Sequence, residues 1–298
     1  MSVFKGAGTA LVTPFNEKGI NFDVFEELIE YQLDGGIDAL IVCGTTGEAA
    51  TMTSEETQAA IDFVVKKTKG RVPVIAGTGC NCTASAVENS KAAADMGADA
   101  LLVVNPYYNK GSRSGVYKHY AMIADAAKTP IIVYNVPSRT GCNLSPDFLA
   151  ELADIDQVVG LKAASSDICQ IADIAANLGD KIDIYSGNDD QIMPLLSLGG
   201  SGVISTIGNI APGATSDIPR NFFAGNIDAA IEGQLKMIPV IRALFNETNP
   251  TPVKAALNLL GFAVGAPRLP MDEATEDTKK RLAKAMSDFG FDIQQEIR

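Results

Sequence analysis

The stretch VVGLKAASS, residues 158–166, combines a short apolar strand, one lysine and a run of small residues. A buried strand rarely ends on lysine unless the side chain reaches solvent or a site. If Lys162 is buried, loss of hydration lowers the pKa of its ammonium, and part of it becomes a neutral nucleophile. Such an amine can form an imine with a carbonyl substrate. The alternative is a lysine whose stem is covered and whose ammonium extends into solvent.

Seven other segments are apolar and continuous in the same way, which is typical of strands buried on both faces of a parallel sheet. The eight predicted strands lie at residues 7–15, 39–43, 72–76, 101–104, 130–136, 158–162, 182–185 and 202–207, and helical patterns alternate with them. This succession predicts an α/β fold, a (β/α)8 TIM barrel. The alternative is an open doubly wound sheet, but no G-x-G-x-x-G follows the first strand.

The chain continues beyond the eighth unit with further helical patterns at residues 227–245, 252–260 and 274–289. A barrel does not need these helices. We therefore expect a catalytic barrel over residues 1–222 and a C-terminal helical region over residues 223–298. Packing between subunits is one use for such helices.

Composition narrows the range of partners. The 298 residues are 46% hydrophobic and carry a formal net charge of −12, which disfavours nucleic acid and anionic membrane surfaces. Residues 1–13 lack the charged and apolar regions of a signal peptide, and no apolar run approaches the length of a membrane span. We expect a cytoplasmic protein.

The cysteines and the single histidine argue against metal chemistry. Five cysteines, an odd number in a long chain, are expected to be reduced thiols, and Cys80 and Cys82 have no second Cys or His cluster to complete a metal site. His119 is the only histidine, so a multi-histidine zinc site is impossible. It falls in a predicted helix and is expected on the helix surface or in the core. No metal is therefore expected.

In a barrel of this kind, the carboxyl ends of the strands face the active site. GTTGE (residues 44–48) follows the second strand, and its glycines and hydroxyls suit an anion-binding nest for a carboxylate. Tyr134 ends the fifth strand, and Arg139 follows in a PSRTG loop where a planar guanidinium suits a carboxylate. The alternatives are a plain turn, a packing aromatic and a solvated loop charge. These residues and Lys162 all converge on one rim.

These motifs resemble those of the dihydrodipicolinate synthase family, within the pyruvate-dependent class I aldolases. The resemblance rests on GTTGE, on YNVPSRTG (residues 134–141) and on Lys162, and extends to NPYYN (residues 105–109) and NPTPVK (residues 249–254). It covers nearly the whole chain. The Arg-bearing loop is the more discriminating motif, because sialic-acid lyases carry different residues there.

The resemblance implies a function and a set of roles. Lys162 would form a Schiff base with pyruvate, and the resulting enamine would attack the aldehyde of aspartate-semialdehyde, without metal or organic cofactor. Tyr134, Thr45 and Tyr108 would form a proton relay, with Tyr108 reaching into a neighbouring subunit across a tight dimer.

Substrate binding would fall to residues on several strand ends. The pyruvate carboxylate would lie against Thr45 and Thr46, and Arg139 would hold the carboxylate of the semialdehyde. Gly187 and Ile204 would line the pocket through their backbones. The expected assembly is a homotetramer built from tight dimers.

The chain departs from the family pattern in two places. Ala163 follows the lysine where many members have an acidic residue. Where lysine-inhibited members place histidines and a glutamate, this chain has Ser54, Thr57 and Ser85, although the allosteric-site residues Asn81 and Tyr107 are retained. We predict weak or absent feedback inhibition by lysine.

Two other functions are compatible with the same residues. One is a different pyruvate-dependent class I aldolase that cleaves a 2-keto-3-deoxy sugar acid or a hydroxy-oxo acid. The other is a catalytically silent barrel that only binds a keto acid. The nucleophile argues against the silent barrel, since binding alone needs no reactive lysine.

Overall fold

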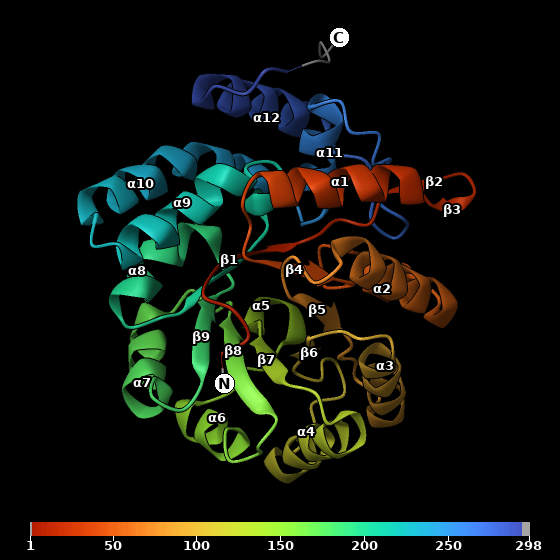
Figure 1. Cartoon of the computed structure of the whole chain (residues 1–298), viewed down its shortest axis with the longest axis vertical. Helices are drawn as coiled ribbons and strands as arrows, with labels where there is room; N and C mark the ends of the chain where they lie inside the picture. Colours follow the sequence, from red (N-terminus) through yellow and green to blue (C-terminus); the bar gives the residue numbers. More distant parts are fainter. Residues whose placement is uncertain (1, 294–298) are drawn as a thin grey trace.

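The protein forms a closed barrel of parallel strands, seen in a computed structural model that describes residues 2–293 (Figure 1). Each strand pairs with its neighbours in chain order, and β1 closes the barrel by pairing with both β4 and β10. The strands are β1 (Gly6–Ala10), β4 (Ala39–Val42), β5 (Val74–Gly77), β6 (Ala100–Val104), β7 (Ile131–Asn135), β8 (Val158–Ala163), β9 (Asp183–Ser186) and β10 (Gly202–Ser205). The predicted (β/α)8 barrel is confirmed.

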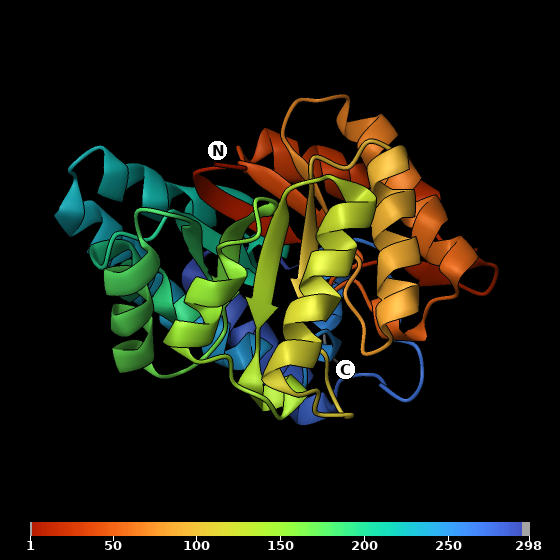
Figure 2. The same ribbon diagram turned by 90° about the horizontal axis from the view of Figure 1, so that it is seen from below.

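Helices follow the strands and surround the barrel, as the views in Figures 1 and 2 show. They are α1 (Phe22–Asp34), α2 (Ser54–Thr68), α3 (Thr83–Asp95), α4 (Arg113–Ala127), α6 (Pro146–Leu152), α7 (Ile168–Leu178), α8 (Ile192–Ser197) and α9 (Pro212–Phe223). Within residues 2–293, no helix is long and apolar enough to cross a membrane.

Side chains that alternate between the two faces of each strand form two separate apolar clusters. One, between the strands and the helices, contains Leu161 and Ala163; the other, inside the barrel, contains Tyr134, Tyr185 and Ile204. Because successive side chains of a strand point to opposite faces, a strand with both faces covered reads as continuously apolar. This explains why the strands could be found in the sequence.

Three helices follow the barrel: α10 (Ile227–Leu244), α11 (Thr251–Leu259) and α12 (Glu276–Phe289). In Figure 1, α11 and α12 lie beyond α1, at the top of the view. Their buried side chains, such as Leu257 and Leu282, belong to the same apolar cluster as the barrel helices. The predicted C-terminal helices are thus confirmed, while a division of the chain at residue 222 stays a prediction.

Three segments differ from the predicted boundaries. The first strand ends at Ala10 rather than at residue 15, and Phe15 instead starts a short hairpin of β2 (Phe15–Asn16) and β3 (Gly19–Ile20). The eighth strand ends at Ser205, and a 3₁₀ turn, η3 (Ile207–Asn209), follows. The PSRTG loop begins with a one-turn helix, α5 (Pro137–Thr140), because proline is well suited to a first helical position.

Candidate active site

Lys162 lies near the carboxyl end of β8 and points into the barrel. The residue is only 6% exposed, so the alternative of an ammonium extended into solvent is wrong. Its register partners are Tyr134 on β7 and Tyr185 on β9, which place the three side chains in one layer of the barrel interior. Ala163, the next residue, joins the cluster between strands and helices. An acidic side chain at position 163 would therefore not face Lys162.

Burial lowers the pKa of the Lys162 ammonium to about 8. The negative charge of Asp189 opposes this shift, and the positive charge of Arg139 adds to it. The Lys162 Nζ lies 4.5 Å from the centroid of the Tyr134 ring. A buried lysine with this pKa carries a substantial neutral fraction near neutral pH, as a nucleophilic amine requires.

The Tyr134 phenol is buried beside the lysine, and burial raises its pKa. The positive charge of Arg139 and the hydroxyl of Thr45 oppose that shift. The phenol therefore stays protonated near neutral pH and can donate a proton. The structure brings Tyr134, Thr45 and Lys162 to one rim of the barrel.

The turn at residues 44–48 differs from the expected anion-binding nest. The backbone N–H groups of Gly47 and Glu48 donate to carbonyls of the same turn, both at 3.1 Å, so they are not free for a ligand. Positive φ falls on Cys43 (55°) and Glu48 (58°), not on the two glycines. The two glycines therefore do not supply the left-handed residues of this turn, whereas an anion-binding nest that uses the Thr45 and Thr46 amides stays a prediction. Packing disfavours a larger residue at Gly47, since a Cβ there would lie 3.2 Å from the backbone nitrogen of Cys43.

Asn249, from the segment before α11, connects two of the predicted binding residues. Its side-chain Nδ2 donates to the Thr46 Oγ1 at 2.9 Å, and its carbonyl accepts a hydrogen bond from the Arg139 Nη2 at 3.0 Å. Thr46 is buried, whereas Arg139 is exposed on α5. The C-terminal region thus contributes directly to the arrangement of the strand-end residues.

A cavity of about 370 Å³ opens at this rim. Its lining includes Thr45, Tyr107, Tyr134, Arg139 and Asn249. The predicted residues that do not line it are Lys162, Thr46, Gly187, Ile204, Tyr108 and Asn81. The Tyr134 ring both lines the cavity and contacts the lysine, so it connects the two.

Gly187 and Ile204 lie on the neighbouring strand ends. The Gly187 N–H donates to the Ala163 carbonyl at 2.6 Å, and a Cβ at this glycine would lie 2.7 Å from the Cβ of Ala164. Ile204 is buried on β10 in the same interior cluster as Tyr134. Their proposed backbone contacts with substrate stay predictions.

The loop after β6 places the remaining predicted residues. Tyr108 is 87% exposed and has a φ of 71°, a conformation rare for a bulky residue. Tyr107 is half-buried, and burial raises the pKa of its phenol. Asn109 Nδ2 donates to the Asn81 carbonyl at 2.9 Å, so this loop lies against the Asn81 segment.

Asp189 is a residue that the sequence analysis did not single out. It is buried at the start of η2 (Asp189–Gln191), and its Oδ2 accepts hydrogen bonds from the backbone N–H groups of Thr206 (3.1 Å) and Ile207 (2.9 Å). Burial raises the pKa of this carboxyl, but the hydroxyl of Ser205, those N–H groups and the charge of Lys162 oppose the shift. Its position just after the seventh predicted strand, at the rim where the other candidate residues lie, is the sequence feature that could have identified it.

The cysteines and His119 lie in different surroundings in the structure. All five thiols are free, and Cys43 is buried. His119 is buried on α4, where its Nδ1 lies 3.0 Å from the Thr83 Oγ1, and burial lowers its pKa. Between residues 2 and 293, no group of three or more His, Cys, Asp or Glu side chains is arranged to hold a metal ion.

A closed parallel barrel with a buried lysine of lowered pKa at its carboxyl rim defines an enzyme of the class I aldolase type. Residues 3–289 match the Dihydrodipicolinate synthetase family, and the chain belongs to this family. The chain is 53% identical over 292 residues to the 4-hydroxy-tetrahydrodipicolinate synthase of Thermoanaerobacter sp. (strain X514), covering 98% of each sequence.

Solved structures agree with this assignment. The dihydrodipicolinate synthase of Aquifex aeolicus superposes with a TM-score of 0.96 at 38% identity, covering 98% of this chain and 100% of the other. A structure described as the first monomeric dihydrodipicolinate synthase variant superposes with a TM-score of 0.95 at 41% identity, covering 97% and 98%.

Proposed function

We propose that this protein is a 4-hydroxy-tetrahydrodipicolinate synthase that condenses pyruvate with L-aspartate-4-semialdehyde, in the diaminopimelate pathway to lysine. The observation that carries the chemistry is Lys162, an almost fully buried amine whose pKa is lowered to about 8. Identity of 53% to a synthase of that name supports the choice of substrates. The imine itself withdraws electrons from the substrate, so the proposal needs no cofactor.

The first half of the reaction forms the imine. The neutral Lys162 amine attacks the C2 carbonyl of pyruvate, and loss of water leaves a protonated imine. Tyr134 is the proposed proton donor to the departing oxygen, with Thr45 and Tyr108 completing a relay. The hydroxyls of Thr45 and Thr46 hold the pyruvate carboxylate.

The second half forms the carbon–carbon bond. Loss of a proton from the pyruvate methyl gives an enamine, whose carbon attacks the aldehyde of the second substrate. Arg139 holds the carboxylate of that substrate, because a guanidinium offers two parallel N–H donors to it. Attack of the semialdehyde's amino group on the imine carbon then closes the ring and frees Lys162.

We also propose a cytoplasmic homotetramer built from tight dimers. Exposure of 87% and a left-handed backbone at Tyr108 support a residue held ready for a neighbouring subunit. Ile227, Ile231 and Leu235 are exposed at four-residue spacing along α10, which suits a second interface. Sedimentation velocity tests the assembly, and a monomer at micromolar concentration contradicts it.

Borohydride trapping with pyruvate, followed by peptide mass mapping, tests the chemistry. We expect a pyruvate-derived adduct on Lys162 and none in Lys162→Arg. An assay with aspartate-semialdehyde then separates this synthase from an aldolase that releases pyruvate from a sugar acid. Absence of an adduct, where a known class I aldolase is trapped, would revive the silent keto-acid-binding barrel.

A further inference from the structure

A buried ion pair joins the turn at residues 44–48 to the C-terminal helices. The Lys254 Nζ, on α11, lies 2.6 Å from the Glu48 Oε1, and the two side chains are 1% and 2% exposed. Glu48 closes the turn that carries Thr45 and Thr46. The pair therefore connects residues that are 206 positions apart in the chain.

Both charged groups are held by further backbone contacts. The Glu48 Oε2 accepts a hydrogen bond from the backbone N–H of Arg268 at 2.7 Å, and the Lys254 Nζ donates to the Ala266 carbonyl at 3.1 Å. These contacts fix the carboxylate between α11 and the segment that follows it. The geometry leaves Glu48 little freedom to change its position.

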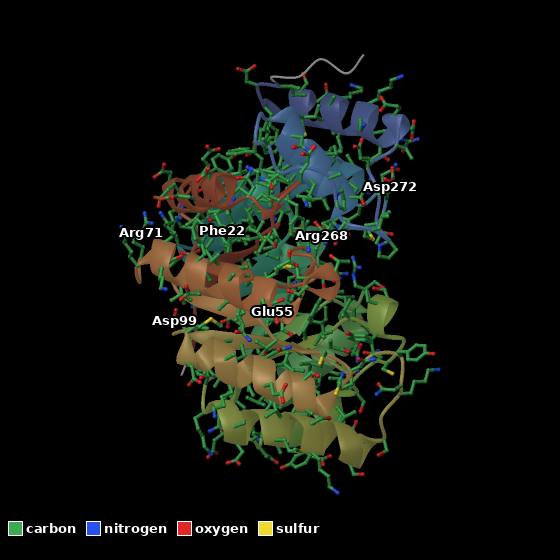
Figure 3. All side chains as sticks on the ribbon, turned by 90° about the vertical axis from the view of Figure 1, so that its right-hand side faces the viewer. Phe22, Glu55, Arg71, Asp99, Arg268 and Asp272 are labelled. Atoms are coloured by element: carbon green, nitrogen blue, oxygen red, sulfur yellow. The ribbon has the colours of Figure 1, made fainter. Side chains whose placement is uncertain are left out.

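A second contact holds the same face of the barrel. The Arg268 guanidinium donates to both carboxylate oxygens of Glu56 on α2, at 2.7 and 2.6 Å, and to the Thr51 carbonyl at 3.2 Å. Figure 3 shows Arg268 between the C-terminal helices and α2, on which Glu55 is labelled. The residues after the turn are thus held to the same C-terminal segment.

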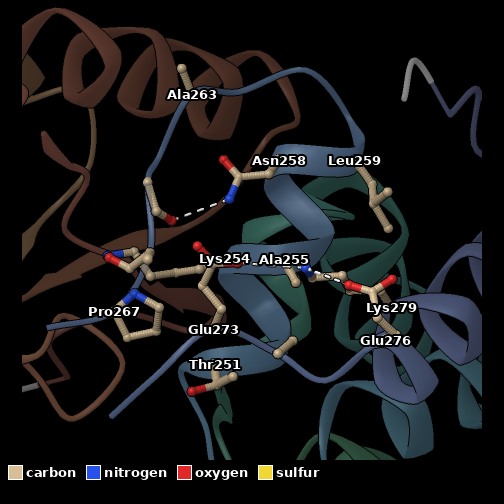
Figure 4. Close-up of a pocket in the computed structure, with 13 residues that line it drawn as sticks. Thr251, Lys254, Ala255, Asn258, Leu259, Ala263, Pro267, Glu273, Glu276 and Lys279 are labelled. Atoms are coloured by element: carbon tan, nitrogen blue, oxygen red, sulfur yellow. Dashed lines mark hydrogen bonds and ion pairs between the residues drawn. The ribbon is translucent and has the colours of Figure 1, made fainter. Parts of the chain in front are cut away.

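The two residues of the ion pair line different cavities. Glu48 lines the 370 Å³ cavity at the strand ends, whereas Lys254 lines a second cavity of about 610 Å³ between α11, α12 and the intervening segment (Figure 4). Polar groups of this lining already have partners: Lys279 pairs with Glu276, and the Asn258 Nδ2 donates to the Gly265 carbonyl. These groups are therefore not free to bind a ligand, and the contact of Lys254 that bears on the site is the one with Glu48.

Burying two charges is costly. Apolar residues of similar size in their place often give a protein of equal or greater stability. The stability of the fold alone thus does not explain the pair. We propose that Glu48 and Lys254 are positioning residues, which hold the 44–48 turn so that the Thr45 and Thr46 hydroxyls face the pyruvate carboxylate. This inference rests on the proposed function.

Three variants test the proposal in the full-length protein. Glu48→Asp keeps the charge but shortens the side chain, so it breaks or displaces the contact. The double variant Glu48→Gln/Lys254→Met removes both charges and leaves no unpaired ion in the core. Leu178→Ala, a core truncation at the end of α7 away from the strand ends, is the control for lost stability.

The readouts are the KM for pyruvate, kcat and the amount of borohydride-trapped imine at saturating pyruvate. We expect both Glu48 variants to raise the KM for pyruvate at least about tenfold, because small misplacements of binding groups are costly, while trapping at saturation persists. Leu178→Ala should lower the melting temperature and leave that KM unchanged.

The outcomes separate the two proposals. A folded double variant whose pyruvate KM lies within twofold of wild type overturns the positioning role and leaves the proposed function intact. Wild-type protein that cannot be trapped with pyruvate overturns the proposed function, and this inference with it. A raised KM in Leu178→Ala would show that lost stability alone is sufficient, and would also overturn the positioning role.

Discussion

The pKa of Lys162 predicts how imine formation depends on pH. With a pKa of about 8, roughly 1% of the amine is neutral at pH 6, about 9% at pH 7 and about half at pH 8. An ordinary lysine with a pKa of 10.5 has only about 0.03% neutral amine at pH 7, so burial increases the reactive fraction roughly 300-fold. The rate should therefore rise about 50-fold from pH 6 to pH 8 and then level off.

Rapid-quench trapping measures this rate directly. Protein and subsaturating pyruvate are mixed at each pH for a set time, and excess borohydride in one common buffer then reduces whatever imine has formed. Intact-protein mass spectrometry counts the adduct, and Lys162→Arg supplies the background. Lys128→Arg, at an exposed lysine that pairs with Asp125, is the matched control and should follow the wild-type profile.

The plateau is the decisive feature of the profile. A rate that keeps rising about tenfold per pH unit through pH 9.5 would mean an unperturbed lysine and would refute the argument from burial. A rate independent of pH from 6 to 9 would refute it as well, because the neutral amine would then not be the attacking species.

Four further predictions follow from the same site. Asp189→Asn removes the charge that supports the Lys162 ammonium, so the midpoint of the trapping profile should fall by about one pH unit; an unchanged midpoint contradicts the coupling. Tyr134→Phe should lower kcat by about 10²–10³-fold, because it removes the proposed proton donor, yet adduct should still accumulate slowly on Lys162. L-Lysine at 1 mM should inhibit by less than half in a steady-state assay, and half-inhibition at a sub-millimolar concentration overturns the interpretation of Ser54, Thr57 and Ser85. Lys162→Met should raise the free energy of unfolding at pH 7 by up to about 3 kcal/mol, because the native state then no longer buries an ammonium. That gain should shrink as the pH rises from about 8 to 10.5, where the wild-type lysine becomes neutral in both states, and urea unfolding measures it.

The barrel could be predicted because its physical signature is local. Each strand has both faces covered, so apolar residues follow one another without strict alternation, as in ALIV of β4, and turn residues bound each strand. The end of β1 could not be predicted in this way. Residues 11 and 12 are buried and apolar, as a strand would be, but pairing stops there: the Leu11 N–H still donates to the Ile41 carbonyl of β4 at 2.9 Å, whereas the Val12 N–H donates to the Asn209 side chain at 3.0 Å. Apolarity reports burial, and only the pairing partner decides whether a buried residue belongs to a strand.

The site could be predicted where it depends on strand ends and could not where it depends on contacts between distant segments. Lys162 and Tyr134 follow from their positions on β8 and β7, since register places them side by side. Asp189 approaches the lysine only because η2 folds back over the ends of β9 and β10. In the turn at residues 44–48, composition could not show which amides stay free, because the Gly47 and Glu48 amides bond within the turn.

The two buried lysines show why residue type and burial do not by themselves identify a nucleophile. Burial lowers the pKa of both ammonium groups. Lys254, however, has the Glu48 carboxylate at 2.6 Å, which opposes the shift, and loss of its proton would leave a buried anion without a counter-charge. Both Nζ atoms lie 4.5 Å from the centroid of an aromatic ring, Tyr134 for Lys162 and Phe15 for Lys254, but within the described part of the chain Lys162 forms no ion pair. The same side chain is therefore an ion-paired cation on α11 and the proposed reactive amine at the end of β8, and a carboxylate in direct contact distinguishes the first from the second.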